Sequence, residues 1–236
     1  MNRFFVRPEA LRGDRVTLGA DQARQVSRVL RLGVGDRIVA LLDGQELEVT
    51  LDRVGRAEAS GLVTARRPCA AEPSVRLTLA LPLLRGDRSE EVLEAVSQLG
   101  AAGIVPFTSE RSVARELSAQ RRARWERIAR ESAETARRGR VPAVEPLARW
   151  PELFDRLEAP VVVPWEEETG PTMWGALDPT ATQLSLVIGP EGGLTAEEIA
   201  LARARGARTV TLGPRNLRSE TAAIAAVAIA LAVARA

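Results

Sequence analysis

The sequence predicts an α/β protein with a parallel sheet, preceded by a smaller β-rich domain. Two glycine-bearing segments near the C-terminus carry this prediction: 188–194 (Ile-Gly-Pro-Glu-Gly-Gly-Leu) and 212–222 (Leu-Gly-Pro-Arg-Asn-Leu-Arg-Ser-Glu-Thr-Ala). Each follows a short apolar run, 184–188 or 209–212, and each leads into a helical pattern. Successive strand–loop–helix units are typical of a parallel sheet whose ligand site lies at the strand ends. A proline-bearing segment without periodicity, 66–73, indicates the domain boundary.

Short strands and one helix are expected in the first part of the chain, residues 1–70. Asp43-Gly44 between two strand candidates is a strong hairpin signal. A helix is expected from Ala20 to about Leu30, because apolar residues recur there at helical spacing. This combination suits a small barrel. The strand candidates are residues 4–6, 15–18, 37–42, 46–51 and 61–65.

The second part, residues 74–236, alternates between strands and helices. Ser89 is the expected N-cap of one helix and Gly100 its stop. Thr195-Ala-Glu-Glu198 matches a capping box, so a helix should start directly after the Gly-Gly pair. The final helix is apolar nearly all round, which predicts burial in the core or at a subunit interface. The other candidates are strands at 75–81, 104–107 and 161–164, and helices at 89–99 and 118–138.

Composition excludes several kinds of chemistry. The chain has no His and no Tyr, and its 33 basic residues are all Arg. A Ser-His-Asp triad, a His-based metal site, a Walker loop and a Schiff-base lysine are therefore excluded. The single Cys69 can form neither an intramolecular disulfide nor a zinc cluster. What remains is chemistry by carboxylates, arginines, hydroxyls, backbone amides and a bound cofactor.

Hydrophobic residues make up 45% of the chain and charged residues 27%, enough for a folded core. We find no segment with the apolar core of a signal peptide, and the most apolar stretch is shorter than the roughly 20 residues that a membrane span needs. A cytoplasmic protein is therefore expected.

Positive charge is concentrated in one region although the net charge is only +2. Residues 111–140 contain ten Arg and four Glu. Arginine suits phosphate because its planar fork of donors matches the phosphate oxygens, so the cluster favours nucleic-acid binding. A solvated amphipathic helix is the equally weighted alternative. With four Phe and four Trp, the chain has few side chains for stacking bases, which favours recognition of RNA by shape and phosphate.

Together, the two glycine-bearing segments resemble the signature of the RsmE family, the 16S ribosomal RNA uridine-N3 methyltransferases of the SPOUT superfamily. The resemblance extends over the full length of the chain. The further matching positions are 29–36 (Val-Leu-Arg-Leu-Gly-Val-Gly-Asp), Asp43-Gly44, Leu99-Gly100, 104–107, Arg111-Ser112, Trp125 and 138–142.

This resemblance implies both a fold and a reaction. It implies a PUA-like RNA-binding barrel in residues 1–70 and a SPOUT methyltransferase domain in residues 74–236 with a deep trefoil knot. The implied reaction is methylation of N3 of a specific uridine in 16S ribosomal RNA of the small subunit, with S-adenosyl-L-methionine as cofactor and no metal. A homodimer with its active site near the interface is implied as well.

The resemblance also assigns roles to residues. Arg218, Glu220 and Thr221 are implied to lie beside the methyl acceptor. Three loops are implied to hold the cofactor, through Pro164, Trp165, Glu166, Ile188, Gly189, Pro190, Glu191, Gly192, Gly193, Leu212, Gly213, Pro214, Asn216 and Leu217, with Thr221 as a further contact. The arginines expected to anchor RNA phosphates are Arg28, Arg31, Arg111, Arg115, Arg121, Arg122 and Arg124.

Methylation of uracil N3 requires loss of the N3 proton, and the negative charge then spreads over the two ring oxygens. An arginine aimed at those oxygens would stabilise the anion. Arg218 is the first candidate for this role and Arg138 the second. Because the chain has no His, the base would be Glu220, Glu191, a water molecule or solvent.

Structural roles compete with these catalytic ones. Arg218 could form an ion pair with Glu220. Glu191 could complement the positive charge of the cofactor or stabilise the following helix through its dipole. Trp165 could lie beside the adenine or pack in the core. Thr221 or Ser219 could cap the final helix.

Four positions depart from the usual RsmE pattern, at Gln25, Ala95, Gln98 and Thr135. They fall in regions that the resemblance places at the RNA or the active site, so they bear on which nucleotide is chosen. Two alternative functions stay open. One is another SPOUT reaction, ribose 2′-O methylation, and the other is an RNA-binding ribosome assembly factor with weak or no catalysis.

Overall fold

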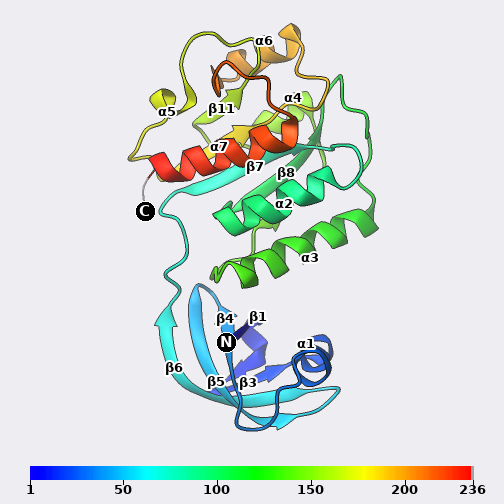
Figure 1. Ribbon diagram of the computed structural model, residues 1–236, viewed down its shortest axis with the longest axis vertical. Coiled ribbons are helices and arrows are strands. Elements are labelled where there is room, and N and C mark those ends of the chain that lie inside the picture. Colours follow the sequence, from blue (N-terminus) through cyan, green and yellow to red (C-terminus); the bar gives the residue numbers. More distant parts are fainter. Residues whose placement is uncertain (235–236) are drawn as a thin grey trace. The chain divides into compact units, whose positions relative to one another are not determined.

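The computed structural model describes residues 1–234, which divide into two compact units (Figure 1). The first unit comprises Met1–Glu72 together with Ala133–Val141, and the second comprises Pro73–Ser132 and the chain from Pro142 onward. The division near Glu72 falls inside the segment expected to be the boundary. The return of residues 133–141 to the first unit was not expected from the sequence.

A six-stranded sheet forms the first unit, in the order β1-β4-β5-β6-β3-β2. Only β1 and β4 pair in parallel, and the remaining neighbours are antiparallel. Its core contains Phe4, Leu18, Val26, Ile38 and Val49. The strands are β1 (Asn2–Phe5), β2 (Leu11–Arg12), β3 (Arg15–Leu18), β4 (Arg37–Leu42), β5 (Gln45–Val54) and β6 (Ala59–Pro68).

The five strands expected in this unit are all present, with β5 and β6 longer than predicted. The hairpin signal is also confirmed, since Asp43 and Gly44 have φ angles of 48° and 77° between β4 and β5. The two-residue strand β2 was missed because it is too short to show a period. A 3-10 helix, η1 (Pro8–Ala10), precedes it. The expected helix is present as α1 (Ala20–Arg24), which continues into a π-helical turn, η2 (Gln25–Val29).

The segment 133–141 packs into the first unit through both apolar and polar contacts. Ala133 and Val141 join a cluster with Phe5, Val39 and Leu41. The backbone N–H of Phe5 donates a hydrogen bond of 3.0 Å to Oε1 of Glu134.

A parallel sheet forms the second unit, in the order β10-β8-β7-β12-β11-β13, with β9 paired to β8. This confirms the α/β class and the parallel sheet that the strand–loop–helix pattern predicts. The strands are β7 (Arg76–Pro82), β8 (Gly103–Thr108), β9 (Ala143–Val144), β10 (Ala148–Arg149), β11 (Val161–Pro164), β12 (Gln183–Val187) and β13 (Arg208–Val210).

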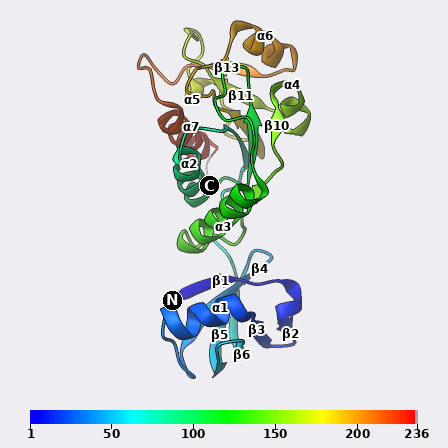
Figure 2. The same ribbon diagram turned by 90° about the vertical axis from the view of Figure 1, so that its right-hand side faces the viewer.

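Helices cover both faces of this sheet (Figure 2). On one face α7 contacts α2 and β7. On the other, side chains of α4 and α6 join a buried cluster that includes Phe107, Trp150, Val163, Val187 and Ile199. The helices are α2 (Arg88–Leu99), α3 (Ala119–Thr135), α4 (Trp150–Leu153) with the 3-10 helix η3 (Phe154–Arg156), α5 (Met173–Ala176), α6 (Ala196–Ala204) and α7 (Ser219–Val233).

The start of α2 differs from the prediction, because the side chain expected to cap it makes another hydrogen bond. Ser89 does not cap α2: the helix begins at Arg88, and the buried Ser89 hydroxyl accepts a hydrogen bond of 2.8 Å from the N–H of Leu84 instead. The stop at Gly100 is confirmed, with φ of 126°. The capping box of α6 is confirmed as well, because the Thr195 hydroxyl and the Glu198 carboxylate each accept a hydrogen bond from the other residue's N–H.

Candidate functional site

Three loops meet the carboxyl edge of the parallel sheet, after β11, β12 and β13. These strands are neighbours in the order β12-β11-β13, so the expected cofactor segments 164–166, 188–193 and 212–217 all start from one edge. The N–H of Trp165 donates to the carbonyl of Val210 at 3.0 Å, which extends the pairing of the first and third segments. The fold therefore gathers at one edge three segments that 21 and 18 residues separate in the sequence.

The loop after β12 is held by packing against its neighbours. Gly193 has φ of 73°, and a Cβ added to it would lie 2.2 Å from Oε1 of Glu166. A Cβ on Gly192 would lie 2.9 Å from Cβ of Arg111, whose Nη1 donates to the carbonyl of Gly192 at 3.0 Å. Glycine at 193 is therefore favoured by its positive φ, and a side chain at 192 would require Arg111 to shift.

The loop after β13 is open by contrast. Gly213 has φ of 107°, and among the described residues the only atom within 4 Å of an added Cβ is Nη2 of Arg215 at 3.8 Å. Pro214, Arg215 and Asn216 are exposed, and Leu217 is partly buried. A ligand can therefore approach the backbone of this loop directly.

Glu191 is fixed by a loop that the sequence analysis did not single out, the β7–α2 loop (residues 83–87). Oε1 of Glu191 accepts a hydrogen bond of 2.9 Å from the N–H of Arg85 and lies 3.7 Å from Nη1 of Arg88. The first turn of α6, which follows this loop, is capped by Thr195 and Glu198. The missed signal is Arg-Gly-Asp-Arg at 85–88, a charged glycine turn between strand and helix like the other two.

Glu220 and Arg218 do not pair with each other. Oε1 of Glu220 lies 3.9 Å from Nε of Arg88, while Oε2 of Glu220 is buried and has no hydrogen-bond partner in the described structure. Arg218 is exposed, and its side chain makes no ion pair or hydrogen bond with the described residues. The ion pair considered for these two residues is therefore absent, which leaves a free guanidinium and an unsatisfied carboxylate oxygen at neighbouring positions of the chain.

Neither candidate for the cap of α7 fills that role. Arg218 occupies the N-cap position, and no side chain caps the helix there. Ser219 is buried inside the helix, whereas Thr221 is exposed.

Trp165 packs against the core cluster under α6, and the guanidinium of Arg203 lies 5.6 Å from its ring centroid. This arrangement favours a packing role for Trp165 at the core over contact with an adenine. Its indole N–H is buried and has no hydrogen-bond partner in the described part of the chain.

Glu168 ties this loop to β13 and α6. Its Oε2 accepts hydrogen bonds from the Thr209 hydroxyl at 2.5 Å and from Arg203 at 2.9 Å, and its Oε1 accepts one from the N–H of Gly170. The hydrogen bond from Thr209, followed by those from Gly170 and Arg203, holds the pKa of Glu168 below its ordinary value of 4.5.

We expect Glu168→Gln to lower the free energy of unfolding by about 1.5–3 kcal/mol near neutral pH, the range for hydrogen bonds to a charged group. A depressed carboxylate pKa contributes stability that is present above 4.5 and is lost as the pH falls through the folded-state pKa. The difference between wild type and variant, measured by urea unfolding, should therefore shrink towards acid pH. An equal difference at neutral and acid pH would contradict this, and the exposed neighbour Glu167→Gln serves as control.

Arg138, the second candidate for stabilising the uracil anion, belongs to the first unit and is only 1% exposed. Its Nη2 lies 2.9 Å from Oε2 of Glu72, and Oε1 of Glu72 accepts hydrogen bonds from the N–H groups of Gly139 and Arg140. This buried pair gives Arg138 a structural role within the first unit.

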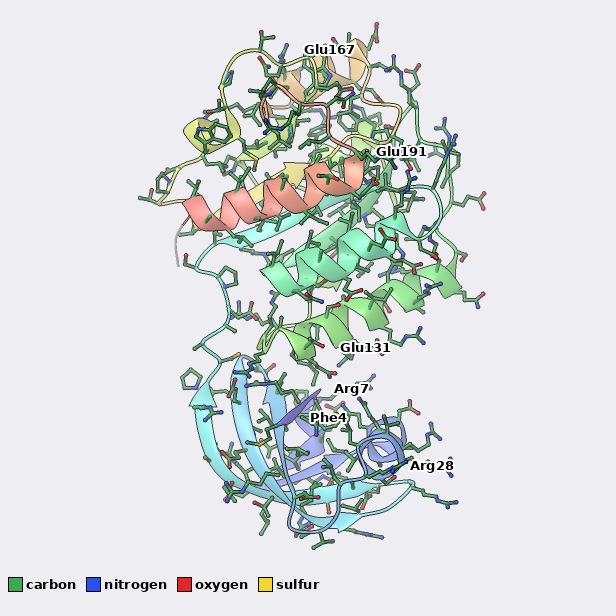
Figure 3. The ribbon with its side chains drawn as sticks, viewed as in Figure 1. Phe4, Arg7, Arg28, Glu131, Glu167 and Glu191 are labelled. Atoms are coloured by element: carbon green, nitrogen blue, oxygen red, sulfur yellow. The ribbon has the colours of Figure 1, made fainter. Side chains whose placement is uncertain are left out.

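The arginines expected to anchor phosphates fall into two groups. Arg28 and Arg31 in the first unit are exposed and make no ion pair or hydrogen bond through their side chains among the described residues; Arg28 is labelled in Figure 3. The five in the second unit each have a protein partner. Four of them donate to backbone carbonyls: Arg111 to Gly192, Arg115 to Ser109 and Glu110, Arg121 to Gly86, and Arg122 to Val144. Arg124 forms an ion pair with the carboxylate of Glu90.

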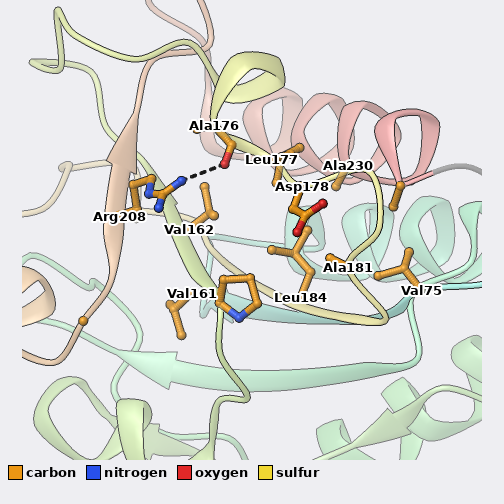
Figure 4. A pocket seen from close by; sticks show the side chains of 13 residues that line it. Val75, Val161, Val162, Ala176, Leu177, Asp178, Ala181, Leu184, Arg208 and Ala230 are labelled. Carbon is orange, nitrogen blue, oxygen red and sulfur yellow. Dashed lines mark hydrogen bonds between the residues drawn. The ribbon is translucent and has the colours of Figure 1, made fainter.

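A cavity of about 260 Å³ lies at the opposite, amino edge of the sheet (Figure 4). Val161, Val162 and Leu184 line it, with Asp178 and Arg208 as its charged members. Nη1 of Arg208 is directed to the carbonyl of Ala176 at 2.9 Å, and none of the predicted site residues lines this cavity.

The described residues offer neither a candidate metal cluster nor a helix that could span a membrane. No cluster of three or more His, Cys, Asp or Glu side chains there could hold a metal ion. Among the same residues, no helix combines the length and apolar character needed to cross a membrane.

Comparison with known proteins gives the class first: residues 71–231 match the family model described as an RNA methyltransferase domain. The ribosomal RNA small subunit methyltransferase E of Bacillus subtilis is 30% identical over 94% of this chain and 93% of its own length. The protein of the same name from Synechocystis is 32% identical over 96% of this chain and 76% of its own length. The chain therefore belongs to the family of ribosomal RNA small subunit methyltransferases E, as the sequence resemblance indicated.

Solved structures agree with this assignment. The ribosomal RNA small subunit methyltransferase E of Neisseria gonorrhoeae bound to S-adenosyl methionine superimposes with a TM-score of 0.88 at 30% identity, covering 97% of this chain and 95% of that one. A methyltransferase of Legionella pneumophila in complex with S-adenosyl methionine gives a TM-score of 0.87 at 25% identity, covering 98% and 96%.

Proposed function

We propose that this protein transfers a methyl group from S-adenosyl-L-methionine to N3 of a specific uridine in 16S ribosomal RNA of the small subunit. The observation that carries the proposal is the buried, unpartnered Oε2 of Glu220 two residues after the unpaired Arg218, beside the strand-end loops. Membership of the family makes the chain an S-adenosylmethionine-dependent ribosomal RNA methyltransferase. The resemblance to that family implies uridine N3 as the target, and these two side chains support it.

The residues at the carboxyl edge fit this cofactor, which would supply an electrophilic methyl group on a positively charged sulfonium. The open backbone around Gly213 can bind a polar ligand, and the carboxylate of Glu191 can complement a positive charge. The residues that would hold the cofactor are Pro164, Glu166, Ile188, Gly189, Pro190, Glu191, Leu212, Gly213, Pro214, Asn216, Leu217 and Thr221. Trp165, Gly192 and Gly193 would support these loops from behind.

Two side chains would act on the uracil. Glu220 would accept the N3 proton on its unpartnered Oε2, and the electron pair left on N3 would then form the new bond to carbon. Arg218, with its guanidinium free, would donate to a ring oxygen where the negative charge collects. Because Oε2 is buried and unsatisfied, a donor that reaches it when the substrate binds would gain more than a donor at an exposed carboxylate.

We also propose that the first unit is the PUA-like RNA-binding barrel and that the second is a SPOUT domain with a deep trefoil knot. The six-stranded, mainly antiparallel arrangement supports the first assignment. In the second unit β11 lies between β12 and β13, so the chain passes β11 on its way from β12 to β13. This order supports the assignment of a SPOUT domain. The cytoplasm, where ribosomal subunits are assembled and modified, is the location we propose.

Within the first unit, Arg28 and Arg31 are the arginines we propose to anchor RNA phosphates. They flank Val29, which is 73% exposed, so charged and apolar side chains are presented together. The double variant Arg28→Met/Arg31→Met should weaken binding of 16S ribosomal RNA and reduce the slope of log K against log salt by about 0.7–0.9 per lost contact. Fluorescence anisotropy over a series of salt concentrations measures this slope. An unchanged slope would contradict the proposal, and Arg53→Met, which removes an arginine paired with Glu58, is the control.

A homodimer is part of the proposal. The helix α7 carries no charged residue after Glu220, and Ala228 and Ala232 are exposed on it. Trp174 on α5, which contacts α7, is 53% exposed. A second copy of the chain would cover these apolar groups.

Two alternatives remain, a ribose 2′-O methyltransferase and an assembly factor without turnover. Transfer of labelled methyl to small ribosomal subunits that lack the modification, followed by alkaline hydrolysis of the RNA, tests both. A ribose 2′-O methyl group protects the adjacent phosphodiester, so labelled dinucleotides would indicate that reaction, whereas labelled mononucleotides support base methylation. No transfer despite cofactor binding measured by calorimetry would favour the assembly factor.

A further inference from the structure

Arg88 lies between two carboxylates that come from different elements. It is the first residue of α2, and its Nη1 lies 3.7 Å from Oε1 of Glu191 in the loop after β12. Its Nε lies 3.9 Å from Oε1 of Glu220 in the first turn of α7. Figure 3 shows Glu191 beside the N-terminal end of α7. One guanidinium therefore links the start of α2, the glycine-bearing loop and the start of α7.

This position is unfavourable for α2 itself. The N-terminus of a helix carries partial positive charge, so an arginine there is disfavoured and an acidic residue is favoured. Glu90 and Glu91 follow the favourable pattern in the same turn, whereas Arg88 opposes it. With 38% of its side chain exposed, Arg88 could extend into solvent. Its location between Glu191 and Glu220 indicates that these carboxylates determine its placement.

The two carboxylates depend on Arg88 to different degrees. Glu191 has a second, shorter partner, the N–H of Arg85 at 2.9 Å. In the described part of the chain Glu220 has no other cationic partner, and its Oε2 has no hydrogen bond. Removing Arg88 would leave Glu191 held by the backbone of the β7–α2 loop, but it would leave Glu220 without any counter-charge beside another carboxylate.

We propose that Arg88 is a positioning residue that holds the carboxylate of Glu220 in place to receive the uracil proton. This inference rests on the proposed function. The distances exceed those of hydrogen bonds, about 2.7–3.2 Å, so the link is mainly electrostatic and does not occupy either oxygen of Glu220. Oε1 faces the guanidinium, and the buried Oε2 has no hydrogen-bond partner in the described structure, so a donor that reaches it on substrate binding would find it unoccupied.

The test is single-turnover methyl transfer by the full-length chain to small ribosomal subunits at saturating cofactor. Arg88→Met should lower the rate about 10- to 100-fold, the loss expected when a reacting group is misplaced by about 1 Å. The dissociation constant for S-adenosylmethionine, measured by calorimetry, should change less than about threefold, because the backbone of Arg85 still holds Glu191. Arg76→Met is the matched control: it removes an arginine at 3.7 Å from Glu158, at the other end of β7.

Two further variants separate positioning from a general structural effect. Arg88→Lys keeps the charge and should restore the rate to within about fivefold of wild type, since the link is electrostatic. In a Glu220→Gln background, Arg88→Met should have no further effect on the rate, because its role is exerted through the Glu220 carboxylate. If Arg88→Met does not fold, Arg88→Gln, which keeps a polar side chain, takes its place.

The outcomes distinguish this inference from the proposed function. A rate for Arg88→Met equal to that of Arg76→Met, an equal loss in the Glu220→Gln background, or a lysine variant as slow as the methionine variant would each overturn it. A wild-type protein that forms no 3-methyluridine would overturn the proposed function itself, before any variant is compared.

Discussion

Arg138→Met should lower the stability of the first unit by about 3–5 kcal/mol, the cost of removing one partner from a buried ion pair. Arg138 is 1% exposed and donates to Glu72, which also accepts hydrogen bonds from the N–H groups of Gly139 and Arg140. The methionine would leave the Glu72 carboxylate partly buried without a counter-charge. The segment 133–141 would lose one of its attachments to the first unit, which should loosen the neighbouring contact between Glu134 and Phe5.

Hydrogen exchange of peptides from β1 and β4 measures this effect within the first unit, because both strands pack against that segment. Arg53→Met is the control, since it removes an exposed arginine of the same unit and should change stability by about 0–1 kcal/mol. Adding Glu72→Gln to Arg138→Met should recover part of the loss, because the amide oxygen can still accept from Gly139 while the unpaired charge is gone. Unchanged exchange together with lost methyl transfer would instead make Arg138 a catalytic residue.

Glu220→Gln should lower the rate of methyl transfer about 10²- to 10⁴-fold, the range for loss of a general base. The amide cannot take the N3 proton, yet it preserves the size of the side chain and its place beside Arg88. Cofactor affinity should stay near the wild-type value, because the proposed cofactor loops do not use this carboxylate. Single-turnover kinetics and calorimetry on the same preparation measure the two quantities.

Glu197→Gln provides a matched control for this variant. Glu197 is the second residue of α6 as Glu220 is the second residue of α7, and it is exposed. Its replacement removes a carboxylate from the first turn of a helix without touching the proposed site. A rate for Glu220→Gln close to that of Glu197→Gln would show that the base is water, solvent or another carboxylate.

Much of the fold is determined by local patterns and could be predicted. The strands 15–18 and 37–42, the Asp43-Gly44 turn and the capping box at Thr195 all depend on residues within a few positions of each other. The features that were missed depend on distant contacts. Residues 133–141 join the first unit because Glu134 and Arg138 meet Phe5 and Glu72, which no periodicity can reveal.

The candidate site likewise combines features that local sequence predicts with features that depend on distant contacts. The glycine-bearing loops were identified because charged residues between glycines stand out in a sequence. The alternative of an ion pair between Arg218 and Glu220 is excluded, and the cation beside Glu220 is Arg88, more than 130 positions away in the chain. The sequence assigned Gly192 and Gly193 to cofactor contact, which stays a prediction; the structure adds that Arg111 and Glu166 lie close to these glycines.

The most direct test of the central claim is nucleoside mass spectrometry of 16S ribosomal RNA after incubation with this protein and S-adenosylmethionine. Small subunits from a strain that lacks the modification serve as substrate. The proposed function predicts 3-methyluridine at a single position, formed by the wild type and strongly reduced with Glu220→Gln. Methylation of a ribose, or of a base other than uracil, would contradict it.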